Sequence, residues 1–140
     1  MSGRLLVAVA TGAMAFAGCS AGGASDVEQI KKLVGDYSRA LADGDGDRAC
    51  RMLTPKARAD IVRANSRLGV TRCEDVAELF HAEGSPEELR ELRSIEIGSV
   101  RVRGDRATGR PVGLHALERT GDTRLRRIDG RWLIDGSTAY

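Results

Sequence analysis

The chain has 140 residues, of which 22 are lysine or arginine and 20 are aspartate or glutamate, so its formal net charge is +2. This near balance gives no reason to expect nucleic acid as a partner, because nucleic-acid-binding surfaces depend on a marked excess of basic charge. Aromatic residues make up 4% of the sequence, so an aromatic ligand cage is not expected and the core must be mostly aliphatic.

The first element is an apolar run over residues 5–17, which follows the basic Arg4 and leads into Cys19. This order is typical of a lipoprotein signal, in which small residues precede a cysteine that becomes the lipid-modified first residue of the mature chain. The run is too short to span a bilayer, which takes about 20 apolar residues. We expect residues 1–18 to be a signal peptide and residues 19–24 a lipid-anchored tether on the extracytoplasmic face of the cell membrane.

An ordinary secretory signal is the alternative, because the segment Ala13-Met14-Ala15 also has the small-x-small pattern of a cleavage site. In that case Cys19 would remain a thiol. Both alternatives place the protein outside the cytoplasm. Both also leave about 120 residues, which suits one compact domain, here residues 25–140.

Helical signals follow one another through the first two-thirds of this domain. Apolar residues recur at helical spacing over residues 26–42, and Ser25 with Glu28 has the pattern of a capping box. Shorter helices are predicted over residues 47–53, over residues 55–68 with Thr54 as N-cap and Gly69 as terminator, from Cys73 through Phe80, and after the cap signal Ser85-Pro86-Glu87-Glu88.

Alternating aspartates in Asp43-Gly44-Asp45-Gly46-Asp47 are similar to the start of a calcium-binding loop. Such a loop needs a glutamate at its twelfth position, and the twelfth residue counted from Asp43 is Thr54. The segment therefore predicts the end of one helix and the N-cap of the next. No Cys-x-x-Cys pair or histidine cluster is present either, so we expect no metal.

The chain has three cysteines, at positions 19, 50 and 73. An odd number invites mispairing in an oxidising compartment. Lipidation of Cys19 would leave Cys50 and Cys73 as a pair, and a disulfide closing a loop of this length would contribute roughly 3 to 4 kcal/mol to stability. The alternative is that Cys50 and Cys73 are separate buried thiols.

From Ser94 onward the apolar period changes from about 3.6 to 2, which predicts strands in place of helices. Ile95 and Ile97 alternate first, and the alternation resumes at Val100 after a shift near Gly98 that indicates a β-bulge. Further strands are predicted over residues 106–112, 123–128 and 131–135, with turns at Gly104-Asp105, Gly121-Asp122 and Asp129-Gly130. These strands form an antiparallel meander.

The turn Asp129-Gly130 predicts a two-residue hairpin loop of type I′. Such a loop places Arg127 opposite Trp132 and Leu125 opposite Ile134. Trp132 and Ile134 then share one face of the sheet. That face should meet the helices, because the only tryptophan of the chain has the most surface to bury.

Arginines recur along the predicted strands, at positions 101, 103, 106, 110, 124, 126, 127 and 131. They could form a basic stripe that attracts anionic lipid headgroups or an acidic wall polymer. The period of two favours a simpler interpretation, in which these are the outward positions of strands with one solvated face.

Helices followed by an antiparallel sheet define an α+β architecture. Within it, the first helix with its end at residues 37–45, the segment 48–53, the hairpin at 104–107 and the closing segment 126–135 resemble small actinobacterial lipoproteins with a nuclear-transport-factor-2-like, or SnoaL-like, cone fold. This resemblance implies N-terminal helices packed on a curled, cystatin-like antiparallel sheet. It also implies that the two cysteines at positions 50 and 73 pair within the helical layer.

The cone fold implies a pocket between the sheet and the first helix, and some SnoaL-like proteins are isomerases, dehydratases or cyclases. The candidates for acid or base catalysis are Tyr37, His115 and Asp135, with His81 on a short helix. Asp135 is out of phase with the apolar positions of its strand, so it should point away from the pocket. No nucleophile elbow, phosphate loop or zinc-protease motif is present, and no cofactor is expected.

The sequence therefore favours an exported, lipid-anchored accessory protein of the cell envelope. Such a protein would bind an envelope partner protein or a small apolar ligand without catalysis. The alternative is a SnoaL-like isomerase, cyclase or dehydratase that acts on a carbonyl compound.

Overall fold

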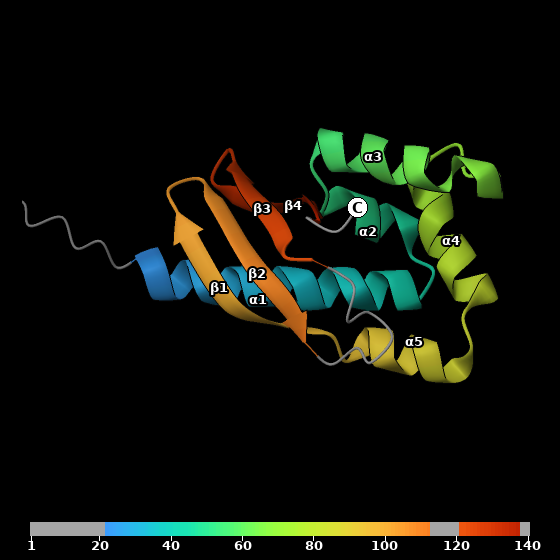
Figure 1. The fold of residues 1–140 in the computed structure, drawn as a ribbon, viewed down its shortest axis with the longest axis horizontal. Coiled ribbons are helices and arrows are strands. Elements are labelled where there is room, and N and C mark those ends of the chain that lie inside the picture. Colours follow the sequence, from blue (N-terminus) through green and yellow to red (C-terminus); the bar gives the residue numbers. More distant parts are fainter. Residues whose placement is uncertain (1–21, 113–120, 138–140) are drawn as a thin grey trace, which may run out of the picture.

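The computed structural model describes residues 22–112 and 121–137, with the backbone alone described for residues 22–24. Helices precede strands along the chain, and the helices pack on a four-stranded antiparallel sheet, so the predicted α+β architecture is confirmed (Figure 1). The elements are α1 (Gly22–Ala42), α2 (Gly46–Arg51), α3 (Pro55–Asn65), the 3₁₀-helix η1 (Ser66–Leu68), α4 (Cys73–Glu83), α5 (Pro86–Arg93), β1 (Glu96–Arg103), β2 (Arg106–Val112), β3 (Thr123–Ile128) and β4 (Arg131–Ser137).

The long helix α1 starts earlier than the sequence predicts, at Gly22 instead of residue 26. The predicted capping box of Ser25 and Glu28 is wrong, because Ser25 lies inside the helix, where its hydroxyl accepts a hydrogen bond from Gln29 Nε2 at 3.1 Å. The helix buries the apolar stripe that its periodicity predicts, with Ile30 fully buried in the core.

Three of the shorter helices, α2, α3 and α5, begin at caps that the sequence predicts. The Asp45 carboxylate accepts a hydrogen bond from the backbone N–H of Arg48 at the start of α2, and the Thr54 hydroxyl does the same for Ala57 in α3. Ser85 and Glu88 form a reciprocal capping box at α5. The helix predicted over residues 55–68 narrows to the 3₁₀-helix η1 in its last turn.

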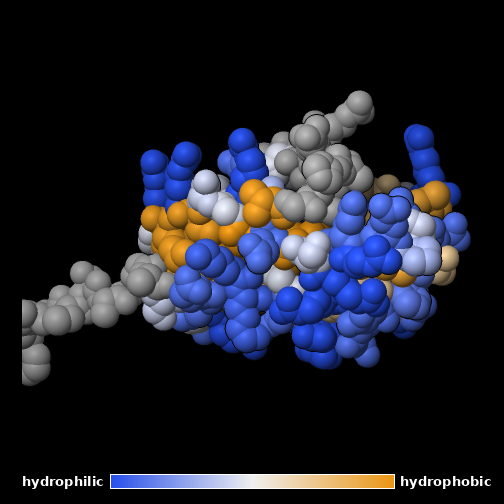
Figure 2. Space-filling view, turned by 90° about the horizontal axis from the view of Figure 1, so that it is seen from below, coloured by the Kyte–Doolittle hydropathy of each residue, from blue (hydrophilic) through white to orange (hydrophobic). Residues whose placement is uncertain are grey.

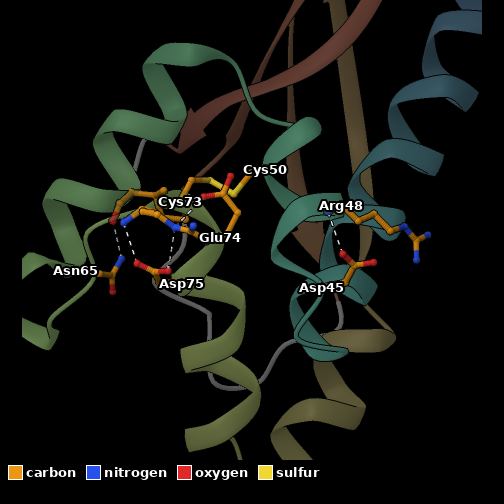
Figure 3. The surroundings of a disulfide bond; sticks show 9 residues. Asp45, Arg48, Cys50, Asn65, Cys73, Glu74 and Asp75 are labelled. Atoms are coloured by element: carbon orange, nitrogen blue, oxygen red, sulfur yellow. Dashed lines mark hydrogen bonds and ion pairs between the residues drawn. A yellow bond between two sulfur atoms is a disulfide. The ribbon is translucent and has the colours of Figure 1, made fainter.

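A disulfide between Cys50 and Cys73 joins α2 to the first residue of α4, so the predicted bridge is confirmed (Figure 3). Their Cα atoms are 6.0 Å apart and both residues are buried. The Asp75 carboxylate accepts hydrogen bonds from the backbone N–H groups of Thr71 and Arg72, which fixes the entry of the chain into α4. The bridge fixes the six-residue helix α2 to the start of α4.

The sheet has the strand order β1-β2-β3-β4 and the predicted hairpin register. Leu125 pairs with Ile134 and Arg127 pairs with Trp132 across the β3–β4 hairpin. Its turn residues Asp129 and Gly130 both have positive φ, +50° and +75°, as a type I′ turn requires. The bulge predicted near Gly98 is also present, as a register shift between Gly98 and Arg101.

The core lies between α1, the short helices and the inner face of the sheet. Trp132 and Ile134 are 5% and 6% exposed and pack with α1, as predicted. At the outer side of β4, the backbone N–H of Thr54 donates to the Ile134 carbonyl at 2.9 Å and that of Ile134 donates to the Met52 carbonyl at 2.9 Å. The chain before α3 therefore covers the β4 edge of the sheet, and β1 forms its other edge.

The prediction that the sheet arginines face solvent holds for exposed residues such as Arg103 and Arg106 but is wrong for Arg127. Arg127 lies beside Trp132 on the inner face, with its guanidinium 4.6 Å from the centroid of the indole ring. Its Nη2 donates to Oδ2 of Asp26 in α1 at 2.5 Å, and Trp132 Nε1 donates to Oδ1 of the same carboxylate at 3.1 Å.

Candidate functional site

Tyr37 and Asp135 are two of the residues predicted for acid or base catalysis. In the structure each of them has a structural role. Tyr37 packs between two parts of the core. Burial raises the pKa of its hydroxyl from 10 to about 12, which makes the group a still weaker acid than an exposed tyrosine. Asp135 accepts a hydrogen bond from Thr54 Oγ1 at 2.8 Å, and the same hydroxyl caps α3. Asp135 therefore positions the start of α3 and is neither a free base nor a fully solvated carboxylate.

His81 also holds the framework together. Its Nδ1 lies 2.9 Å from the carbonyl oxygen of Ala42 at the end of α1, which makes Nδ1 the protonated nitrogen. Arg93 Nη2 donates to the same carbonyl at 3.4 Å, so α4 and α5 both cap the C-terminus of α1. His115 and the predicted lipidation site Cys19 lie outside the described residues.

Within residues 22–112 and 121–137, no group of three or more histidine, cysteine, aspartate or glutamate side chains is placed to hold a metal ion. The helices in this part of the chain are all too short or too polar to cross a membrane.

An apolar pocket of about 690 Å³ opens between η1, the end of α4 and α5. Its volume lies within the range of about 300 to 1,000 Å³ that is usual for small-molecule sites. Leu68 and Phe80 are 66% and 46% exposed, which is unusual for such large apolar side chains. The apolar lining consists of Leu68, Leu79, Phe80, Leu89 and Leu92.

The breaks between the short helices create this pocket. Gly69, with φ +82°, ends η1 and lets the chain turn back toward α4. At the other side, a Cβ atom on Gly84 would lie 2.7 Å from the Phe80 carbonyl oxygen and 2.8 Å from Leu89 Cδ2. Only glycine therefore allows α5 to approach the end of α4 so closely. The sequence indicates both helix ends, through Gly69 and through the cap signal at residues 85–88. The apolar face predicted for α4 does not indicate that Phe80 stays exposed beside a pocket.

The rim of the pocket is acidic. Glu83, Glu88 and Glu91 line it together with Asn65. Hydrogen bonds from the backbone and side chain of Ser85 lower the pKa of Glu88, which keeps this carboxylate ionised. The rim therefore favours neutral or cationic ligands that donate hydrogen bonds, and it disfavours anions.

A second groove, of about 590 Å³, lies between α1 and β1, where the cone fold implies a pocket. Its helix wall carries Lys31, Lys32 and Arg39, and its sheet wall includes Ile97 and Val112. Each of the three cations is paired with a carboxylate of α1 itself. Lys32 and Arg39 share Asp36, so the three cations have two carboxylate partners and this wall keeps a positive charge. The pocket lined by leucines and Phe80 therefore suits an uncharged ligand better.

Helices packed on an antiparallel sheet, with a ligand-sized pocket beside the core, define the class of this domain as a nuclear-transport-factor-2-like α+β cone. A family model described as "putative lumazine-binding" matches residues 25–135, and the chain belongs to this family. The family is of the same cone type. No curated protein matches the chain.

Proposed function

We propose that this protein is an exported, lipid-anchored accessory protein of the cell envelope that binds a small planar ligand of the lumazine class. The observation that carries the proposal is the apolar pocket between η1, α4 and α5, with its exposed Phe80 and Leu68. The family description supports a small-molecule ligand.

The chemistry of a lumazine suits this pocket. A lumazine is a flat bicyclic pteridinedione, and the Phe80 ring offers an aromatic surface on which such a ring can stack. Ring N–H groups of the ligand can donate to the carboxylates of Glu83, Glu88 and Glu91 at the rim. The apolar floor and polar rim are the combination that small-molecule sites generally use.

Anchoring is supported by the signal pattern in the sequence, with basic Arg4, the apolar residues 5–17 and Cys19. In Figure 1 the start of α1 lies at one end of the molecule, and α4 and α5 lie at the other. The 21 residues of α1 span about 30 Å. A lipid on Cys19 would thus hold the domain by the end remote from the pocket, which leaves the pocket open to solutes.

Titration calorimetry with lumazine as the probe tests this proposal. Saturable binding is expected, and Phe80→Ala should weaken the affinity about tenfold, because it removes the stacking surface. Since Phe80 is nearly half exposed, the variant should keep its fold, which a thermal melt would verify.

Val112→Ala is the matched control. Val112 is 47% exposed, against 46% for Phe80, but it lies on β2 outside the pocket. Lumazine affinity should be unchanged in this variant. Absence of saturable binding, or equal effects of the two substitutions, would rule out the pocket as the lumazine site.

A further inference from the structure

We infer that the outer face of the sheet, at the end where its two hairpins turn, is a docking surface for anionic phospholipid headgroups. Its central feature is a row of arginines across β1, β2 and β3, formed by Arg103, Arg106 and Arg126, which we call the arginine row. The inference deepens the proposed membrane anchoring and rests on it for the location of the surface.

The sheet register aligns the arginine row. Arg103 pairs with Arg106 across the β1–β2 hairpin, and Arg106 pairs with Arg126 across β2 and β3. The neighbouring residues Ala107 and Leu125 are buried in the core, so the row points to the opposite face of the sheet. Like charges directly opposite one another disfavour strand pairing. An anionic surface would remove this repulsion.

The arginine row has no carboxylate partner in the described part of the chain. Arg110, further along β2, forms an ion pair with Asp122 at 3.1 Å. Arg103, Arg106 and Arg126 form none with any described residue. Figure 2 shows long hydrophilic side chains projecting from the sheet side of the molecule. Within residues 22–112 and 121–137, no carboxylate therefore competes with a ligand for these guanidinium groups.

Acidic residues at this end of the sheet do not cancel the positive charge. Asp105 and Asp129 lie in the two hairpin turns and are exposed. Asp26 is occupied by Arg127 and Trp132 on the inner side. The exposed Arg131 lies beside the row on β4, so the described hairpin end carries four outward arginines against two turn aspartates.

The arginine row lies at the end of the domain where the lipid would be attached. Contacts of Asp26 with Arg127 and Trp132 place the first turns of α1 against the β3–β4 hairpin. The helix begins at Gly22, so the chain between Cys19 and the helix can span no more than about 10 Å. This distance is close to the Debye length of about 8 Å at physiological ionic strength. An anchored domain would therefore keep the start of α1, and with it the hairpin end of the sheet, near an anionic surface.

A phospholipid surface suits this face better than a protein partner. Guanidinium groups bind phosphate oxygens through paired N–H donors. Stable protein interfaces are instead centred on buried aromatic or large apolar anchors. The outer face of the described strands has no aromatic side chain at this end, because Trp132 is on the inner face. Its large apolar residues, Ile128 and Leu133, are only partly exposed.

Vesicle co-sedimentation tests the docking surface. The probe is the mature chain, residues 19–140 with Cys19→Ser, which contains the whole core and the disulfide without the lipid. It should bind phosphatidylcholine vesicles only when they contain phosphatidylglycerol, and binding should weaken as salt is raised. Changing all three arginines of the row to glutamine should weaken binding about 100-fold, at about fivefold for each arginine.

The matched control is Arg58→Gln with Arg67→Gln and Arg90→Gln, which removes the same charge from exposed positions on α3, η1 and α5. This control should bind anionic vesicles as well as the parent chain does. Equal loss in both triple variants, equal binding to uncharged vesicles, or full binding without the arginine row would overturn the inference. Binding to soluble polyglutamate but not to vesicles would instead assign the face to an acidic protein.

The proposed docking surface and the proposed ligand site can be tested independently of each other. The arginine row and the apolar pocket share no residue, so the triple variant should keep its lumazine affinity. Loss of vesicle binding with intact lumazine binding therefore concerns the docking surface alone. An unchanged melting temperature of the triple variant would exclude unfolding as the cause.

Discussion

Asp26 is the residue that ties the start of α1 to the sheet. Both of its carboxylate oxygens are used, one by the Arg127 guanidinium and one by the Trp132 indole N–H. A buried carboxylate is tolerated only when it is paired in this way. Residues 26 and 127 are 101 positions apart, so neither a periodicity nor a local motif indicates the contact.

Asp26→Ala should lower the free energy of unfolding by about 1 to 3 kcal/mol, because it leaves the indole N–H and the guanidinium without their acceptor. Urea denaturation followed by Trp132 fluorescence would measure the change. Glu28→Ala is the control, since Glu28 is 73% exposed and pairs with Lys31 on the helix surface. It should cost less than about 1 kcal/mol. Similar effects of the two substitutions would contradict a special role for Asp26.

Tyr37 should make stability sensitive to alkaline pH. Burial raises its pKa from the ordinary value of 10 to about 12, so the folded chain keeps the hydroxyl proton over a pH range in which the unfolded chain loses it. The stability linked to this proton is fully present below pH 10 and is lost as the pH rises toward 12, about 3 kcal/mol in all.

A spectrophotometric titration of Tyr140→Phe, which leaves Tyr37 as the only tyrosine, should show ionisation near pH 12. Unfolding measured in parallel should lose this alkaline dependence in Tyr37→Phe. Ionisation of Tyr37 near pH 10 in the folded chain would show that the hydroxyl is accessible to water.

Among the helices and strands, the predictions that the structure confirms depend on interactions between residues only a few positions apart. Asp129-Gly130 determines the hairpin register because a two-residue loop allows one pairing of the flanking strands. Thr54 and Ser85 cap helices through hydrogen bonds three residues away. The capping box at Ser25 fails because the preceding backbone continues the helix, so the backbone donors that it would serve are already within α1.

The disulfide should account for much of the stability of the helical layer. Cys50 and Cys73 are 23 positions apart, and closing a loop of this size is expected to stabilise the fold by about 3 kcal/mol. Replacing both cysteines by alanine should lower the free energy of unfolding in urea by that amount. A reducing agent should produce a similar loss in the parent chain and none in the double variant. Sensitivity of the double variant to reductant would show that a different group responds.

At the scale of the whole molecule, the sequence predicts the layers and their order but not the surface that they create. The apolar pocket forms where η1, α4 and α5 meet, and its position depends on how closely α5 approaches α4 at Gly84. The arginine row depends on the register of three strands. Sequence alternation places these arginines on one face, whereas their lack of partners becomes visible only in three dimensions.

The proposed anchor predicts that Cys19→Ser will move the protein from the membrane fraction to the soluble fraction. The Cys50–Cys73 disulfide should still form, since both cysteines lie in the described core, in α2 and α4. Cell fractionation with a non-reducing gel would measure both properties. Retention of the variant in membranes after a high-salt wash would contradict anchoring through Cys19.

The register shift in β1 has a consequence for how separate copies of this protein meet. The chain at Leu53 and Thr54 covers the β4 side of the sheet, so β1 is the remaining edge of the sheet in the described part of the chain. An exposed edge invites pairing with another strand and hence aggregation. The bulge between Gly98 and Arg101, where Ser99 has φ +50°, interrupts the regular spacing that such pairing requires. Arg101 and Arg103 add charge to the same edge, so β1 is a poor template for amyloid-like growth.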